Sequence, residues 1–415
     1  MIDMNQLTAP PCGASVWSTN SLIMGKPVWL CTTAPFNAKS GFQHKLLCDG
    51  YTFSAGTSCA YSCRYCYVES QVLKQKPVRQ VLERSQRRFD EVVLRRREPL
   101  RQLARQLTRR ATSADQAIRC DRLLSAALVE QLGLPGRAAN YMGAEFNGKV
   151  IYGSPLADVA ATKDLAAETV ELCELMLRLT AFDIRLLSKS PLLASHVAQP
   201  LAERMPESKT RVIYGLSTGT VGDGTVAGNK YADRVARAIE PDAPSPTRRL
   251  QAIHWLQDNG FRVYGVVCPI LPQADPVEYA RQVVQAIRAD RCEHVWAEPF
   301  NARVQKSANS EEAASARPRD SFAATLDGLL EAGFAEEAQR FQRQTGDPGQ
   351  WEHYARATFE AFAEAVPPLN GGPRLRWLQY PGDYEVITSY WAGKQAQGAV
   401  LLGGMVTKAR QKGIV

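Results

Sequence analysis

Short runs of β-branched and apolar residues recur along the middle of the chain and alternate with longer stretches of helical periodicity. These runs predict strands at residues 51–55, 150–153, 183–188, 212–217, 262–267 and 294–297. Helices are expected between the strands, for example over residues 164–179 and 277–289. Strands that alternate with helices build βαβ units around a parallel sheet. The pattern therefore predicts an α/β fold made of six such units.

One of these helices has clear start and end signals, in the stretch PDAPSPTRRLQAIHWLQDNGF. Ser245 suits the N-cap, Pro246 suits the first helical position, and Gly260 suits the end of the helix. A strand is predicted directly after the glycine. This segment is therefore interpreted as a crossover helix of the scaffold.

The composition agrees with a globular protein, since 45% of the 415 residues are hydrophobic and 22% are charged. We divide the chain into an N-terminal extension over residues 1–50, an α/β part over 51–301, and a polar linker with a C-terminal cap over 302–415. The extension is expected to pack on the α/β part. The sequence contains no apolar run of about 18 residues, so it predicts no membrane-spanning helix. Residues 1–21 lack the pattern of a secretory signal, so a cytoplasmic protein is expected.

The net charge of +8 comes from one segment of the chain. Residues 74–122 hold fifteen Lys and Arg against six Asp and Glu, inside a long insertion at about residues 73–131. Leucines at near-helical spacing in VLRRREPLRQLARQLTRRA predict an amphipathic helix with a basic face that includes Arg95–Arg97. Such a face would bind the phosphates of a nucleic acid, dock an acidic protein partner, or remain solvated.

The strongest chemical signal is the stretch SCAYSCRYCYVES, which follows the first predicted strand. It holds Cys59, Cys63 and Cys66, three thiols within eight residues. Iron–sulfur clusters are held by cysteine thiolates at such short spacings. A structural zinc site needs four ligands, usually as two separated pairs, and no second pair follows. A thioredoxin-like motif would explain Cys63 and Cys66 but not Cys59.

The cysteine spacing, with an aromatic residue before the last cysteine, resembles the signature of radical S-adenosylmethionine (SAM) enzymes. The stretches LLSKSPLL, GLSTGT, IEPDAPSPTRRLQAI and GVVCPILP resemble the branch that contains spore photoproduct lyase, and the resemblance covers about residues 51–301. It implies a partial (βα)6 TIM-like barrel with functional residues at its strand ends. It also implies a [4Fe–4S] cluster on the three cysteines, with SAM bound at the open iron. The reduced cluster would cleave SAM to a 5′-deoxyadenosyl radical that abstracts hydrogen from a substrate.

The resemblance also assigns roles to residues near the ends of the predicted strands. Lys189 and Ser217 match a lysine and a serine that contact SAM in this branch, and Tyr65 is expected against the adenine. Ser154 stands where many radical SAM enzymes have a Gly-Gly-Glu-like run, so it is a weaker candidate for binding SAM. Glu298, in WAEPFN, is expected to hydrogen-bond ribose or substrate, or to belong to a structural loop.

Two cysteines outside the loop are candidates for a catalytic hydrogen-atom donor. Cys268 follows the fifth predicted strand at the mouth of the expected barrel, whereas Cys120 lies in the basic insertion. The lyase uses a cysteine shortly after its cluster loop, and only Cys120 matches that position, by order alone. Free cysteines are commonly buried apolar residues, and this alternative applies to both.

The sequence supports three functional hypotheses. The first is a radical SAM enzyme that acts on a nucleic acid base or lesion, with an external electron donor of the flavodoxin or ferredoxin type. The second keeps the radical chemistry and acts on a peptide or a small metabolite. The third is a non-catalytic iron–sulfur protein that binds nucleic acid. Cleavage of SAM by the reduced protein separates the third hypothesis from the first two.

Overall fold

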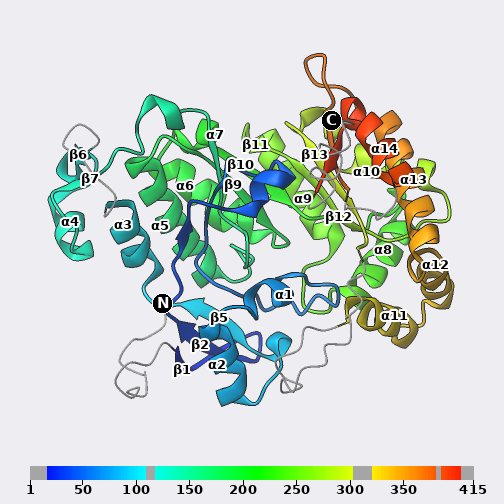
Figure 1. The fold of residues 1–415 in the computed structure, drawn as a ribbon, viewed down its shortest axis with the longest axis horizontal. Coiled ribbons are helices and arrows are strands. Elements are labelled where there is room, and N and C mark those ends of the chain that lie inside the picture. The colour runs from blue at the N-terminus through cyan, green and yellow to red at the C-terminus, as the bar shows by residue number, and fades with distance from the viewer. Residues whose placement is uncertain (1–15, 109–116, 302–319, 380–384, 403–415) are drawn as a thin grey trace.

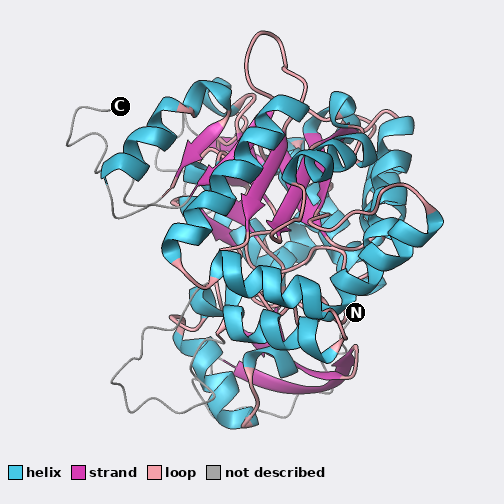
Figure 2. Ribbon diagram, turned by 90° about the vertical axis from the view of Figure 1, so that its right-hand side faces the viewer, coloured by secondary structure: helices cyan, strands magenta, loops and turns pink. Residues whose placement is uncertain are grey.

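The computed structural model of the chain describes residues 16–108, 117–301, 320–379 and 385–402. Parallel strands occupy the centre of the molecule and helices surround them (Figure 1 and Figure 2). The predicted α/β fold is therefore confirmed. The parallel strands are β4 (Tyr51–Phe53), β8 (Val150–Tyr152), β9 (Asp183–Ser188), β10 (Val212–Leu216), β11 (Arg262–Val263), β12 (Gly265–Ile270), β13 (Val295–Pro299), β14 (Leu375–Gln379) and β15 (Ala399–Leu401).

These strands form two sheets, and the strand order continues from the first sheet into the second. The first sheet runs β11–β10–β9–β8–β4, with the antiparallel strand β3 (Phe36–Asn37) at its edge, and the second runs β12–β13–β14–β15. A parallel bridge between Ser217 and Val266 links the end of β10 to β12. Neighbouring strands are parallel, so their carboxyl ends lie at one edge. This edge is where the loops after β4, β8, β9 and β10 can meet.

The strand predicted at residues 183–188 has the bounds of β9, but the strand predicted at 262–267 is divided between the two sheets. Tyr264 N donates to Tyr214 O in β10 at 3.0 Å, whereas Gly265 N donates to His294 O, next to β13, at 2.8 Å. The backbone thus changes its partner strand at this point. In the C-terminal part, β14 and β15 extend the sheet beyond β13.

Helices connect the strands and cover them. Their bounds are α1 (Val68–Val72), α2 (Lys76–Ser85), α3 (Pro99–Thr108), α4 (Ala126–Leu132), α5 (Lys163–Leu179), α6 (Gln199–Arg204), α7 (Ser208–Arg211), α8 (Val226–Ile239), α9 (Pro246–Asp258), α10 (Pro276–Ala286), α11 (Ser321–Glu331), α12 (Ala335–Thr345), α13 (Pro348–Ala365) and α14 (Glu385–Gly393). The start of α9 is as predicted, with Ser245 as its N-cap and Pro246 in its first turn. Among the described helices, none is long and apolar enough to cross a membrane.

The N-terminal extension contributes to the interior of the sheet. Leu47 and Cys48 belong to the same buried apolar cluster as Tyr264 and Trp296. Arg185, in β9, donates to the backbone oxygen of Leu47 at 2.7 Å, and Trp296 Nε1 donates to the backbone oxygen of Lys45 at 2.8 Å. The short 3-10 helix Gly41–Lys45 and the residues after it are thereby fixed against the parallel strands.

A smaller sheet lies apart from the parallel strands (Figure 2). It combines an antiparallel hairpin, β1 (Val16–Ile23) and β2 (Lys26–Cys31), with the parallel strand β5 (Val93–Arg96). Helix α2 packs on it through buried aliphatic side chains such as Val78 and Leu82. The N-terminal extension and the first part of the insertion thus share one sheet. A second small sheet pairs β6 (Ala117–Arg119) with β7 (Arg137–Ala139) in antiparallel orientation.

The predicted amphipathic helix is confirmed in part, since α3 buries Leu103 and Leu107, but it does not extend back through Arg95–Arg97. Arg95 and Arg96 lie in β5 and are each 6% exposed. Arg95 pairs with Glu168, and Arg96 Nε donates to Ser54 O at 2.8 Å. The guanidinium of Arg97 lies 4.8 Å from the ring centroid of Trp17. The β-branched run before these arginines favours a strand, and partners far away in the sequence compensate their burial.

Candidate metal centre

The three cysteines lie on the loop that leaves the carboxyl end of β4 and leads into α1. Hydrogen bonds to strand β5 fix the start of this loop. Thr57 N donates to Leu94 O at 3.0 Å, and Leu94 N donates to Ser58 Oγ at 2.8 Å. Near the end of the loop, Cys66 N donates to Cys63 O at 3.1 Å. The protein itself therefore holds the cysteine loop, residues 54–67, in a defined shape.

The surroundings of the thiols disfavour free-thiol chemistry. Burial raises the pKa of Cys59 and Cys63 to about 12, and that of Cys66 to about 11. Thiols with such pKa values are protonated and weakly nucleophilic at neutral pH, which argues against a thioredoxin-like role. A metal displaces the proton from a coordinating thiol. The raised pKa values are therefore compatible with a role as ligands.

Backbone amides point at two of the three sulfurs. The N–H groups of Tyr61 and Asp158 donate to Cys59, and the N–H group of Val68 donates to Cys66. Amide groups of this kind stabilise thiolate ligands and tune iron–sulfur clusters. Within the described residues, no three His, Cys, Asp or Glu side chains are arranged to hold a single metal ion. A [4Fe–4S] cluster binds each cysteine through a different iron, and a cluster on this loop stays a prediction.

Three of the residues predicted to bind a cofactor meet beside the cysteine loop. Lys189 follows β9, and its Nζ donates to Tyr65 Oη at 2.7 Å and to Ser217 Oγ at 3.3 Å. Lys189 also interacts electrostatically with Cys63. The ring of Tyr65 meets Phe300 edge-on, with 6.5 Å between the centroids. The structure thus brings Tyr65, Lys189 and Ser217 together, and their part in binding SAM stays a prediction.

Two charged residues that the sequence analysis missed complete this group. The carboxylate of Glu240, at the end of α8, accepts hydrogen bonds from Lys189 Nζ at 2.8 Å and from Tyr65 Oη. Arg249, on the first turn of α9, donates to the other oxygen of Glu240 and, at 2.9 Å, to Ser217 O. The side chains of Glu240 and Arg249 are 5% and 1% exposed. Both lie in the stretch IEPDAPSPTRRLQAI, whose resemblance to the spore photoproduct lyase branch is the sequence feature that could have identified them.

The charges of this buried group stabilise one another. Burial alone would raise the pKa of Glu240, but Arg249 and Lys189 outweigh that effect and lower the pKa to about 2. Burial alone would lower the pKa of Lys189, but the carboxylate of Glu240 raises it above the usual value. Glu240 is therefore a carboxylate at neutral pH, and Lys189 is an ammonium group beside the cysteine loop.

Asp158 fixes the backbone that carries Lys189. Its two carboxylate oxygens accept hydrogen bonds from Lys189 N and Ser188 Oγ, both at 2.7 Å. Burial raises the pKa of Asp158, although these hydrogen bonds act in the opposite direction. The sequence analysis missed this residue as well. Asp158 follows the second predicted strand, and an acidic residue at this position is the sequence feature that could have identified it.

Ser154 has a structural contact that the sequence did not reveal. Its Oγ accepts a hydrogen bond from Leu187 N at 2.8 Å, and the residue is 8% exposed. The hydroxyl therefore joins the end of β8 to β9. This contact supports a structural role for Ser154 more than a role in binding a cofactor.

Cys268 and Glu298 lie together near the carboxyl ends of β12 and β13. Cys268 Sγ donates to Glu298 Oε2 at 3.7 Å, and Lys45 Nζ lies 3.5 Å from the same oxygen. Lys45 comes from the N-terminal extension, and its Nζ is 5.5 Å from the ring centroid of Tyr67, next to Cys66. Among the described cysteines outside the loop, Cys268 is the one that is not buried. It therefore remains a candidate for catalysis.

A catalytic role for Cys120 is not supported. The residue is fully buried after β6, in the part of the insertion that also carries β7 and α4. These elements pack near α3, and Figure 1 shows them at the far left of the molecule, well separated from α1. The insertion folds away from the cysteine loop, so the order of cysteines along the chain does not predict their proximity.

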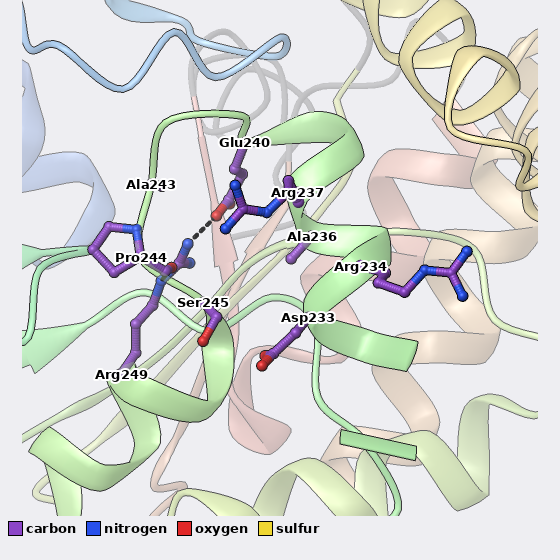
Figure 3. Close-up of a pocket in the computed structure, with 9 residues that line it drawn as sticks. All are labelled: Asp233, Arg234, Ala236, Arg237, Glu240, Ala243, Pro244, Ser245 and Arg249. Carbon is purple, nitrogen blue, oxygen red and sulfur yellow. Dashed lines mark hydrogen bonds and ion pairs between the residues drawn. The ribbon is translucent and has the colours of Figure 1, made fainter. Parts of the chain in front are cut away.

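A cavity of about 250 Å³ borders the Glu240–Arg249 ion pair. It lies between the end of α8 and the start of α9, and Figure 3 shows Glu240 and Arg249 facing each other at one side of it. Arg237 and Ser245 also line the cavity. Glu240 thus contacts Lys189 with one carboxylate oxygen and Arg249, in the wall of this cavity, with the other.

Helix α11 supports the cysteine loop from another direction. Arg64 N donates to Ile239 O at 2.9 Å, and Arg64 Nη2 lies 2.8 Å from Glu331 Oε2 on α11. Gly328 leaves room for this contact. A Cβ atom at Gly328 would lie 2.4 Å from Ala238 O and 2.6 Å from Arg64 Cδ. The helix and the loop therefore approach as closely as a glycine allows.

Gly328→Ala is expected to lower the free energy of unfolding by about 1–2 kcal/mol, since overpacking costs more than the helix gains from alanine. Urea unfolding of the purified protein measures the change. Gly393→Ala is the matched control, because no atom lies within 4 Å of its new Cβ. If Gly328→Ala proved as stable as the wild type, the close packing of α11 on the loop would be contradicted.

Comparisons with known proteins found similarity at the level of structure. No family model matches the chain, and no curated protein matches it. A solved structure of spore photoproduct lyase in complex with a dinucleoside spore photoproduct has 14% identity and a TM-score of 0.38, with coverage of 66% of this chain and 60% of that one. A tyrosine-to-phenylalanine variant of the lyase has 12% identity and a TM-score of 0.44, with coverage of 81% and 78%. At such low identity and TM-score the similarity decides neither the fold nor the function of this chain.

Proposed function

We propose that the chain is a radical SAM enzyme. The observation that carries the proposal is the cysteine loop, in which Cys59, Cys63 and Cys66 follow a parallel strand, with a buried ammonium beside them. The raised thiol pKa values argue against redox or nucleophilic thiols and are compatible with metal ligands. The consecutive order of the parallel strands supports a partial barrel with this loop at its mouth.

In this proposal the three cysteines hold a [4Fe–4S] cluster, and the neighbouring side chains bind SAM. A reduced cluster bound there would supply the electron for the reductive cleavage of SAM to a 5′-deoxyadenosyl radical. Lys189 would bind the carboxylate group of SAM as a point charge. Glu240 keeps the ammonium of Lys189 charged, and Arg249 holds the carboxylate of Glu240 in place. Ser217, whose hydroxyl donates to Cys268 O at 2.7 Å, would orient the same ligand.

The proposed substrate is a nucleic acid base or lesion, and Cys268 and Glu298 are the residues proposed to face it. The buried Arg95 and Arg96 cannot contact phosphates, so a nucleic acid would have to meet other cations. Exposed cations that follow the cysteine loop along the chain include Lys74, Arg84, Arg87 and Arg88. An external protein of the flavodoxin or ferredoxin type is proposed as electron donor. A cytoplasmic location would keep the thiols reduced.

The experiment is anaerobic reconstitution of the protein with iron and sulfide, followed by reduction and addition of SAM. We expect about four iron atoms per chain and formation of 5′-deoxyadenosine that requires the reductant. DNA, RNA and a peptide mixture are then added in separate reactions. The addition that accelerates SAM cleavage identifies the substrate class. A protein that binds zinc in place of a cluster would overturn the proposal. A loaded, reducible cluster that never cleaves SAM, with any of these additions, would favour a non-catalytic iron–sulfur protein.

A further inference from the structure

The cysteine loop is also held by a residue far from it in the sequence. Lys26 lies at the start of β2, directly after the turn of the N-terminal hairpin. Its Nζ donates to Ala60 O at 2.5 Å and to Ser62 Oγ, both between Cys59 and Cys63. The same Nζ lies 3.0 Å from Asp242 Oδ2, in the turn between α8 and α9. One ammonium group thus joins three separate parts of the chain.

Ser62 is the position in the loop that most needs such support. Its φ is +52°, in the left-handed region that disfavours residues other than glycine. This conformation is strained for a residue with a Cβ atom and persists where the surroundings impose it. The hydroxyl of Ser62 accepts the hydrogen bond from Lys26 and donates to Asp90 O at 3.3 Å. Lys26 and Asp90 therefore hold the turn between the first two cysteines from both sides.

The charge of Lys26 acts on whatever the cysteines hold. The side chain of Lys26 is 15% exposed, whereas that of its partner Asp242 is 38% exposed. Solvent screens the more exposed carboxylate more strongly, so it only partly offsets the ammonium. A cluster bound by three thiolates becomes more negative when it gains an electron. A nearby positive charge favours that reduced state and raises the reduction potential.

We propose that Lys26 is a positioning residue for the iron–sulfur cluster, which keeps the cysteine loop in its ligating shape and raises the reduction potential of the cluster. This inference rests on the proposed function, since it requires the three cysteines to hold a cluster. It assigns to the N-terminal hairpin a part in the active site that its distance along the chain does not indicate. The hydrogen bonds of Lys26 help the loop to retain the cluster, and the positive charge of Lys26 raises the reduction potential of the cluster.

The test compares Lys26→Met, Asp242→Asn and the control Lys76→Met in the full-length, reconstituted protein. Lys76 is an exposed lysine on α2. We expect Lys26→Met to lose iron to a chelator about tenfold faster than the wild type, a typical effect of removing a group that supports metal ligands. Its midpoint potential should be more negative. Asp242→Asn keeps the contacts of Lys26 with the loop and removes the opposing charge, so its potential should be more positive.

A measurement without metal separates this inference from the proposed function. In the apo-protein, Lys26→Met should expose the loop to trypsin at Arg64 severalfold faster than Lys76→Met does. If the wild type holds a cluster and Lys26→Met equals it in iron loss, potential and cleavage at Arg64, the inference is wrong and the proposed function stands. Potentials that shift in the same direction in Lys26→Met and Asp242→Asn would refute the role of charge. A wild type that holds no cluster would overturn the proposed function, and the inference with it.

Discussion

Replacing any one of Cys59, Cys63 and Cys66 by alanine should reduce SAM cleavage by at least about a hundredfold. The three cysteines act together, so the loss of one should cost about as much as the loss of all three. Each cysteine would supply one thiolate of the proposed cluster, and backbone amides aimed at Cys59 and Cys66 cannot replace a missing sulfur. The measurements are iron per chain, the visible absorption of the cluster, and 5′-deoxyadenosine formed after reduction.

The chain offers matched controls for this prediction. Cys173, buried within α5, and Cys120, in the distant insertion, should be replaceable by alanine without loss of iron. Cys268→Ala should also keep iron and SAM cleavage, since Cys268 is outside the loop, and any loss should be confined to the product made from the substrate. If Cys63→Ala kept the iron content of the wild type, the assignment of the cluster to this loop would have to be abandoned.

Glu240→Gln should lower the free energy of unfolding by about 3–5 kcal/mol, the usual cost of leaving buried charges without their partner. The substitution removes the carboxylate that neutralises Lys189 and Arg249, which lie in the interior at hydrogen-bonding distance from it. Affinity for SAM should fall as well, since Lys189 would no longer be held beside Ser217. Urea unfolding of the apo-protein and equilibrium binding of SAM to the reconstituted protein measure the two effects.

The same residue predicts how stability depends on pH. The pKa of Glu240 is lowered from its usual 4.5 to about 2 in the folded protein. A carboxylate with a depressed pKa contributes its stability above the unfolded pKa and loses it as the pH falls toward the folded value. Between pH 4.5 and 2 the wild type should therefore lose about 3 kcal/mol that Glu240→Gln does not lose. The difference between the two unfolding free energies should shrink over this range.

Glu331→Gln is the matched control for Glu240→Gln. Glu331 also pairs with an arginine, at 2.8 Å from Arg64, but its side chain is 65% exposed. Exposed ion pairs contribute about 0–1 kcal/mol, so its loss should be small. Equal effects of the two substitutions would mean that the burial of Glu240 is not what makes it important.

Part of the fold and of the site could be predicted from local sequence patterns. The run at residues 183–188 has the bounds of β9 because its β-branched and apolar side chains are buried in a parallel sheet. Lys189 and Ser217 were placed after consecutive strands, and parallel strands bring such residues to one edge. The structure accordingly places these two side chains 3.3 Å apart. The strand at Arg95 and Arg96 was missed, since the compensation of buried arginines depends on Ser54 and Glu168, which no local pattern identifies.

By itself, the sequence determined the α/β fold, the three cysteines on one loop, and the strand-end residues beside that loop. These features depend on spacing and periodicity, which are properties of neighbouring residues. Only the tertiary structure decided that Glu240, Arg249 and Lys26 meet at the cysteine loop and that Cys120 does not. Their positions depend on how a helix-to-helix turn, a β-hairpin and an insertion pack against the sheet. That packing is set by burial and charge compensation between distant segments of the chain.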